Sequence, residues 1–540
     1  YPALSLATPA NVILPGQGGS PFAFPVMFLG RALGSAFASP PAPRSLEAER
    51  LSLGISGEMA NGFDMDLNYT FSAEQNSGKQ PDTSTSRFLN AIRGGSGSPG
   101  TWNLFDSTSN SQELIDYIST AQGTFVDVEL HVLDFVMTGT VNDLEVATGF
   151  QMRKEHHDVA RNDDSIAGFD ANGNLAVPAD LIFLGGGIET SASRSAYAIF
   201  AEAAKQASER VELRGAVRYE KLESDSSINP KVSIRMQAND NLVLRGSLST
   251  SFREPSLSQL NQSSVGLQGV QDFDAAGNAV GQPSFIRIAQ AYSSDLIPEE
   301  STNLNIGAIW TPNDQFSAKF DYWSIDYTDV ITIESAQGKV IADPSGPDVV
   351  RLVDGTLIGV TTRYKNASEI DTDGYDIEAS YNFESRLGDV TLGINRAHML
   401  SYEIPAAGGG SKDVLGLFNH DNFARSLPET KTVISASLVN GQHSMSAFYR
   451  MISDYKTTNV PNAFATSVGL GQDIDEFNVL DLKYSYSFDM DDSNLSLSFG
   501  VKNATDEGAP FFYDSANFNY DPRQHDPRGR IVYMGVKYSR

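Results

Sequence analysis

The stretch that decides the fold lies near the end of the chain: Asp526-Pro-Arg-Gly-Arg-Ile-Val-Tyr-Met-Gly-Val-Lys-Tyr538. Apolar and polar residues alternate through its second half, as they do along a β-strand whose successive side chains point to opposite faces. One predicted face carries Val532, Met534, Val536 and Tyr538. The other carries Tyr533, Gly535, Lys537 and Ser539. A strand with one apolar and one polar face suits a barrel whose outside meets lipid and whose inside is wet.

The same two-residue period recurs through much of the sequence. It is clearest over residues 63–72, 211–220, 480–488 and 495–501. A soluble β-sandwich can alternate in the same way, but Tyr and Phe repeatedly stand at the ends of these apolar faces. Aromatic residues at those positions are typical of the girdles that mark the two lipid interfaces of a membrane barrel. The pattern therefore predicts an all-β, transmembrane antiparallel β-barrel.

The connections between the predicted strands sort into short turns and long polar loops. Short turns are expected near Asn61-Gly62, Asn239-Asp240 and Asn440-Gly441, and long ones over about residues 76–123, 161–192 and 508–528. Alternating short and long connections are typical of short periplasmic turns and long extracellular loops. We count about seventeen strands over residues 47–540. Bacterial barrels normally have an even number, so the count predicts an incomplete barrel. Residues 1–46 are expected to be an extracellular loop or N-terminal extension.

Composition narrows the classes of function. The 540 residues include no cysteine and carry a formal net charge of -28. The missing cysteines exclude disulfides and thiolate chemistry, and the acidic balance argues against a nucleic-acid partner. The sequence opens on Tyr1-Pro-Ala-Leu, which has neither the basic nor the apolar region of a signal peptide, so we expect the chain to be processed or to be one piece of something longer. No apolar run is long enough to predict a membrane-spanning helix.

Candidate metal ligands are weak. Asp170, Asn172 and Asn174 resemble a fragment of a calcium loop, but the bidentate Glu that usually completes such a loop is not at the expected distance. A hairpin turn with Gly173 in the left-handed region is the favoured interpretation. His156 and His157 are adjacent on a strand, so they point to opposite faces and cannot chelate one metal together. We therefore predict neither a metal site nor a cofactor.

The candidate ligand-binding residues are mostly aromatic and lie in the last long loop. They are Phe511, Phe512, Tyr513, Phe518 and Tyr520, to which Arg253 is added at the outer end of an earlier strand. Aromatic rings can stack on a sugar ring, a catecholate or a corrin. The same rings can pack against neighbouring loops instead, and Arg253 can pair with a carboxylate to fix a loop. The residues alone leave these alternatives open.

No catalytic constellation is present in the sequence. It contains no Gly-x-Ser-x-Gly with a plausible triad, no His-Glu-x-x-His and no phosphate-binding loop. We therefore predict that the protein is not an enzyme.

Several stretches resemble the barrel of TonB-dependent outer-membrane transporters, in the family's order. They are Gly246 to Leu260 with its Phe-Arg-Glu-Pro-Ser, Pro298 to Gly307, Phe320 to Ile331, Val501 to Glu507 and Asp526 to Tyr538. Pro15 to Phe28 and Trp102 to Phe105 resemble loop segments of the same receptors. Two features depart from the pattern. No plug domain is present, and the sequence ends Tyr538-Ser539-Arg540 where the family tends to end on an aromatic residue.

The resemblance implies active uptake of a scarce nutrient, such as a siderophore, cobalamin or an oligosaccharide, across the outer membrane of a Gram-negative bacterium. The family barrel has 22 strands and a plugged lumen. This chain would supply about seventeen of those strands and would need a separate N-terminal chain that carries the plug and the remaining strands. TonB would act through that plug, and outer-membrane lipid and lipopolysaccharide would surround the barrel.

Two other functions remain open. A passive porin would select cations by the acidic residues of its lumen. A surface scaffold would use its long loops to bind a lipoprotein or an extracellular layer. The odd strand count and the family motifs favour the transporter, and the transported ligand is beyond what the sequence specifies.

Overall fold

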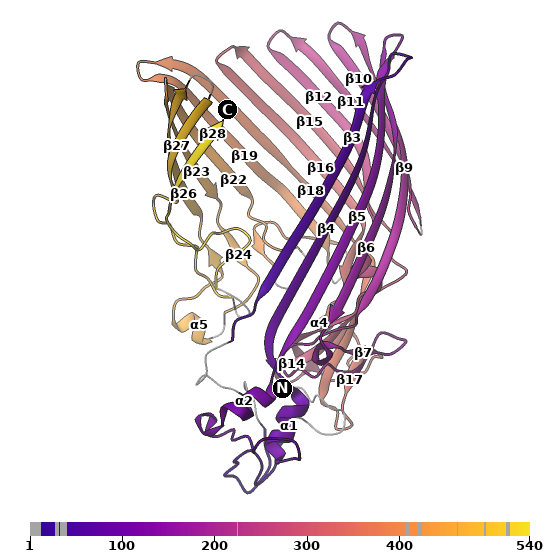
Figure 1. Ribbon diagram of the computed structural model, residues 1–540, viewed down its shortest axis with the longest axis vertical. Helices are drawn as coiled ribbons and strands as arrows, with labels where there is room; N and C mark the ends of the chain where they lie inside the picture. The colour runs from indigo at the N-terminus through magenta and orange to yellow at the C-terminus, as the bar shows by residue number, and fades with distance from the viewer. Residues whose placement is uncertain are drawn as a thin grey trace.

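The computed structural model of the protein describes residues 12–27, 32, 40–223, 225–406, 410–419, 424–461, 463–490, 493–514 and 519–539. One antiparallel β-sheet curves around a lumen, and smaller elements cluster at one end of it (Figure 1). Across the sheet the strands are β3 (Arg44–Glu58), β4 (Asp64–Thr83), β5 (Ser119–Val141), β6 (Leu144–Arg161), β9 (Thr190–Ser208), β10 (Val211–Lys221), β11 (Ser226–Asn239), β12 (Leu242–Arg253), β15 (Glu299–Asn313), β16 (Phe316–Ile333), β18 (Leu357–Ser385), β19 (Gly388–Pro405), β22 (Thr430–Asn440), β23 (His443–Ile452), β26 (Phe477–Met490), β27 (Ser493–Lys502) and β28 (Ile531–Ser539).

The register of the sheet gathers the apolar residues on its convex face. Met534 of β28 lies opposite Phe499 of β27, and Phe499 lies opposite Tyr484 of β26. Val532, Met534, Val536 and Tyr538 are 59–80% exposed. Because side chains alternate along a strand, the polar residues between them face the concave side, called the lumen wall below. The predicted alternation is therefore confirmed as a continuous apolar surface.

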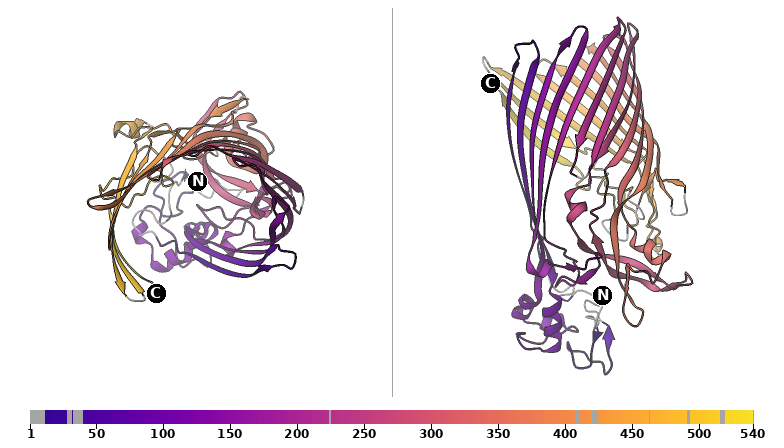
Figure 2. Two further views of the ribbon diagram at one scale, coloured as in Figure 1. Left: turned by 90° about the horizontal axis from the view of Figure 1, so that it is seen from above. Right: turned by 90° about the vertical axis from the view of Figure 1, so that its right-hand side faces the viewer.

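The sheet has two margins, at β3 and β28. Register pairs join each neighbouring pair of sheet strands, but none joins β28 to β3 in the described part of the chain. Seen from above, the wall is an arc with the C-terminus at one margin (Figure 2). β3 leads into the short turn before β4, and β28 follows the long segment 503–530, so both strands run towards the end of the sheet that carries the short turns (Figure 1).

The opposite end carries the long connections, which have small cores of their own. The first core surrounds Trp102, whose ring is fully buried with Phe88 and Ile118. The helical elements are α1 (Thr85–Arg93), η1 (Ser107–Ser109), α2 (Gln112–Ile118), η2 (Asp163–Ser165), α3 (Leu257–Asn261), α4 (Ala336–Ala342) and α5 (Ala463–Ser467). The remaining strands are β1 (Val12–Ile13), β2 (Val26–Met27), β7 (Gly168–Phe169), β8 (Leu175–Val177), β13 (Ser264–Phe273), β14 (Ala279–Ala291), β17 (Val349–Arg351), β20 (Ser411–Asp413), β21 (Leu417–Phe418), β24 (Tyr455–Thr457) and β25 (Asp473–Ile474).

None of the helices among the described residues combines the length and the apolar character needed to cross a membrane. The helices are instead confined to the long connections, where they pack against one another and against strand ends.

The apolar convex face predicts that a charged side chain placed on it destabilises the protein in a bilayer. Leu482→Arg places a cation on the lipid side, beside Ala447 and Val501. We expect it to destabilise the protein in lipid bilayers by about 2–4 kcal/mol, measured by denaturant unfolding. Ser485→Arg, on the lumen wall of the same strand, is the control and should cost far less. Equal losses for the two variants would contradict the assignment of the faces.

Candidate functional site on the lumen wall

A buried carboxylate organises the polar side chains near the loop end of the lumen wall. The Glu220 side chain, at the end of β10, is 2% exposed. Its two oxygens lie 2.5 Å from Arg153 Nη2 and 2.7 Å from Arg218 Nη2. Arg218 also donates to Gln151 Oε1 at 2.9 Å, and Gln151 donates to Asp134 at 2.6 Å. Ion pairs and side-chain hydrogen bonds therefore tie together β5, β6 and β10, and reach across β9, which lies between β6 and β10.

A second ion-pair network adjoins the first. Arg194 of β9 lies 2.7 Å from a Glu155 oxygen and 3.5 Å from a Glu254 oxygen. Arg194 also donates to the carbonyl of Pro255. Glu254 follows the end of β12, where burial raises its pKa and the neighbouring Glu155 adds to the shift. Because Arg153 is 4.0 Å from Glu254, the two networks form one cluster of alternating charge.

Arg253, a predicted ligand contact, is engaged by Glu299 of β15. Its guanidinium donates to both carboxylate oxygens, with Nη2 2.6 Å from Oε1. Glu299 Oε1 also accepts from the backbone N–H of Ile331 at 2.7 Å. The Arg253 side chain is 55% exposed, so one side of the guanidinium still faces open space. The geometry matches the loop-fixing role considered for it, and ligand contact stays a prediction.

The predicted aromatic residues of the last long loop have different surroundings. Phe512 is 1% exposed and packs edge-on against Phe418, with ring centroids 5.6 Å apart. Phe511, its neighbour in sequence, is 67% exposed. Tyr513 and Tyr520 are half-buried, and Phe518 lies outside the described residues. Of the four described rings, Phe511 is therefore the most available for stacking on a ligand, while Phe512 is buried in the core of the loop.

The weak calcium candidates form a turn between β7 and β8. One carboxylate oxygen of Asp170 accepts from the backbone N–H groups of Asn172 and Asn174, at 2.8 and 2.9 Å. Asn174 Nδ2 donates to the other oxygen at 3.3 Å, and Gly173 has a φ of +78°. These contacts are those of the hairpin turn that the sequence favoured. No group of three or more potential metal-ligating side chains occurs among the residues that the structure describes.

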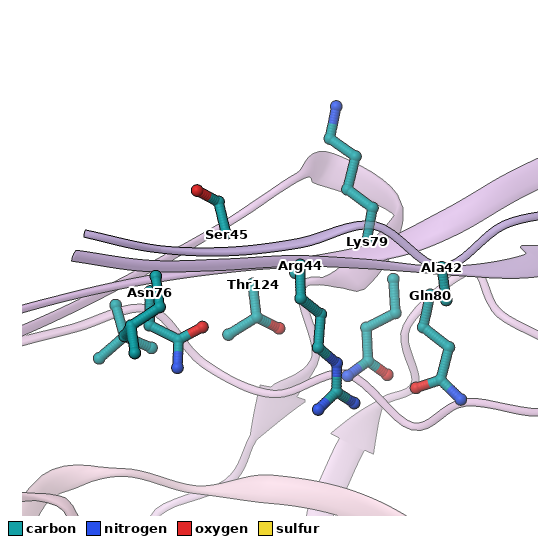
Figure 3. Close-up of a pocket in the computed structure, with 11 residues that line it drawn as sticks. Ala42, Arg44, Ser45, Asn76, Lys79, Gln80 and Thr124 are labelled. Carbon is teal, nitrogen blue, oxygen red and sulfur yellow. The ribbon is translucent and has the colours of Figure 1, made fainter. Parts of the chain in front are cut away.

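A polar hollow of about 400 Å³ lies on the lumen wall at the β3 margin, and polar alternation is the one feature of the sequence that points to it. Arg44, Asn76, Gln80 and Thr124 point together to one side of the sheet, while Ser45 and Lys79 point to the other (Figure 3). Leu46 and Val126 complete the lining. Carboxamides beside one guanidinium offer hydrogen-bond donors and acceptors, so this surface can bind polar groups but has no nucleophile–base pair for bond chemistry.

His525 is a buried residue that sequence reasoning missed. It is 3% exposed and lies between Tyr455 and Phe477, with ring centroids 5.9 and 5.1 Å away. Beside it, the Tyr455 hydroxyl donates to Asp521 at 2.6 Å. Burial lowers the pKa of His525, although the charge of Asp521 opposes the shift. A single His in a polar loop gives no sequence signal for such burial.

The Glu220 cluster predicts a strong effect of a nearly isosteric change. Glu220→Gln leaves Arg153 and Arg218 without their shared counter-charge, a carboxylate whose side chain is only 2% exposed. We expect a loss of about 3 kcal/mol in unfolding free energy, measured by denaturant titration. Glu378→Gln removes the exposed pair of Glu378 with Lys319 and should cost less than about 1 kcal/mol. A Glu220 variant as stable as that control would contradict the organising role.

His525 predicts acid sensitivity of the last loop. Its native pKa is depressed, so below the ordinary value of about 6.5 the unfolded loop takes up a proton that the folded loop does not. The contribution of His525 to the stability of the folded loop is therefore fully present at pH 7.5. It is lost as the pH falls below about 6.5. Limited proteolysis of the loop should be severalfold faster at pH 5 than at pH 7.5, and His525→Phe should reduce that difference. An unchanged pH dependence in the variant would exclude His525 as its source.

Comparison with known proteins places this geometry in a family. The family model described as "TonB dependent receptor-like, beta-barrel" matches residues 13–504. No curated protein matches the sequence. Among solved structures, a mutant ferric enterobactin receptor of Pseudomonas aeruginosa bound to enterobactin has a TM-score of 0.62 at 15% identity. A siderophore receptor of Acinetobacter baumannii scores 0.60 at 14%, and the P. aeruginosa ferripyoverdine receptor scores 0.52 at 13%.

Coverage differs between the two sides of these comparisons. The first two structures match 92% of this chain but 62% of their own chains, and the ferripyoverdine receptor matches 85% and 52%. This chain therefore spans less than two thirds of each of these three receptors. Because the family model covers most of the sequence, the chain belongs to the TonB-dependent receptor β-barrel family, whose members lie in the outer membrane of Gram-negative bacteria.

Proposed function

We propose that this chain is the C-terminal barrel portion of a TonB-dependent transporter that takes up a scarce nutrient. The observation that carries the proposal is the family match over residues 13–504 on a sheet with an apolar convex face and a charged lumen wall. The structurally similar receptors include ones for ferric enterobactin and ferripyoverdine. A siderophore is therefore one candidate cargo, beside cobalamin and oligosaccharides.

The two open margins support completion of the barrel by further strands. Unpaired backbone groups in lipid cost several kcal/mol each, so β3 and β28 need partners. Both strands run in the same direction, so direct pairing would make a parallel contact in an otherwise antiparallel wall. Antiparallel closure requires an odd number of additional strands. Five such strands would complete the 22-stranded barrel expected of the family.

The charged lumen wall supports a plug as a further partner. Its ion-pair cluster around Glu220 faces the space that a plug would fill. The plug and missing strands would come from sequence outside these residues, and a separate N-terminal chain is the arrangement we propose. TonB would act through that plug, driving its displacement with the proton-motive force. The barrel itself would supply a rigid wall and part of the ligand surface.

The transport proposal predicts dependence on TonB. Cells producing the complete receptor should take up at least one of four probes: ferric enterobactin, ferripyoverdine, cyanocobalamin or a maltooligosaccharide. Deleting TonB should abolish that uptake, because the plug would remain in place. Uptake that proceeds equally without TonB would instead support the passive porin.

The two-chain arrangement predicts what co-purifies with this chain. Intact mass spectrometry and N-terminal sequencing of the membrane complex should find a stoichiometric second polypeptide that carries a plug and several strands. A plug joined covalently to this chain would reject the separate chain but keep the transporter. Purification of this chain alone as a closed, conducting pore would contradict both.

A further inference from the structure

A second hollow of the lumen wall collects positive charge in a strongly acidic chain. It measures about 480 Å³ and spans β10, β11 and β12. Its charged lining residues are Glu212, Arg214, Lys231, Arg235 and Arg245. Counted together with Glu202 and Asp321, which pair with two of these cations, the four cations and three carboxylates leave one net positive charge, although the whole protein carries -28. Such a local reversal of sign marks a surface suited to an anionic partner.

Two of these cations are balanced by carboxylates and two are not. Arg214 lies 3.0 Å from Glu202 and 3.3 Å from Glu212, and Arg245 lies 2.5 Å from Asp321. In the part of the chain that the structure describes, no carboxylate lies within ion-pair distance of Lys231 or Arg235. Glu212 stands opposite Arg235 across β10 and β11, yet its carboxylate turns to Arg214.

The register makes the uncompensated charge costly. Arg235 lies directly opposite Arg245 on the neighbouring strand. Like charges at opposite positions of an antiparallel pair destabilise the sheet. An anion held between the guanidinium groups would remove that repulsion, and charge-assisted hydrogen bonds to it would be among the stronger ones available.

Neutral donors surround the two free cations. Ser233 and Ser247 are opposite each other on β11 and β12. This pair is two residues along the strands from the Arg235–Arg245 pair, and two residues in the other direction from the Lys231–Ser249 pair. Asn305 of β15 lines the same hollow. Two hydroxyls and one carboxamide can donate to oxygens that the cations leave unbonded. The site thus offers both charge and directional hydrogen bonds over a small area.

We propose that this hollow is an anion site on the lumen wall, which binds a carboxylate or phosphate group of a solute inside the barrel. Lys231 and Arg235 supply the free charge, and Ser233, Ser247 and Asn305 supply neutral donors. The inference rests on the proposed transport function only for the origin of the solute, because binding itself is an equilibrium property of the wall.

The test is calorimetric titration of the complete purified receptor with citrate and, separately, with inorganic phosphate. We expect binding that weakens as salt is added, since exposed charges are screened. The double variant Lys231→Gln/Arg235→Gln should bind at least about tenfold more weakly, because two charge-assisted contacts are lost. The matched control Lys483→Gln/Lys537→Gln removes the same charge from the lumen wall outside the hollow and should bind as the wild type does.

Two results would overturn the proposal. The first is an equal loss in the control, which would show a general effect of lumen charge. The second is no binding of either probe by the wild-type receptor. If the Lys231→Gln/Arg235→Gln variant then also has a looser plug, measured by plug proteolysis, the two cations pair with plug carboxylates instead. Failure of TonB-dependent uptake with intact citrate binding would count against the transport function and leave the anion site standing.

Discussion

The need to pair every backbone N–H and C=O group within lipid governs this structure. A lipid-facing strand has no water to bond, so its polar backbone groups must be satisfied by neighbouring strands. The long antiparallel ladders from β3 to β28 meet that need everywhere except at the two margins. The strand lengths and the short turns at one end follow from it. The long connections are free of this backbone-pairing constraint, and they contain the helices and the small hydrophobic cores.

The lumen wall follows a different rule, because its side chains face a wet interior. Charges there are tolerated but still organised: Glu220 joins Arg153 and Arg218, and Glu254 joins that group to Arg194. These contacts stiffen the wall across strands without apolar packing. The cationic hollow of β10 to β12 is the exception within this order, since Lys231 and Arg235 have no carboxylate at ion-pair distance in the described chain. The lumen wall thus combines a region in which cations and carboxylates are paired with a region in which two cations have no carboxylate partner.

The long connections use ordinary hydrophobic cores to position their side chains. Phe512 and Tyr455 are buried in one such core, and Trp102 in another. Phe512, which the sequence offers as a ligand-binding ring, is therefore removed from solvent by the packing of its loop. Phe511, one residue away, stays exposed. Phe511 and Phe512 are the same residue type, so only the packing of the loop decides which ring is structural and which is available to a ligand.

The sequence by itself determined the strands and their two faces. The two-residue period of residues 532–538 and 480–488 reports local backbone geometry, which each strand carries in its own residues. The sequence also predicted the hairpin turn at Asp170. Only the tertiary structure decided that Arg253 meets Glu299, that His525 is buried beside Tyr455, and that Arg235 stands opposite Arg245. The first two contacts join residues far apart in the chain, so they depend on the pairing of distant strands and on loop packing. The third depends on the register of the β11–β12 hairpin, which its short turn sets.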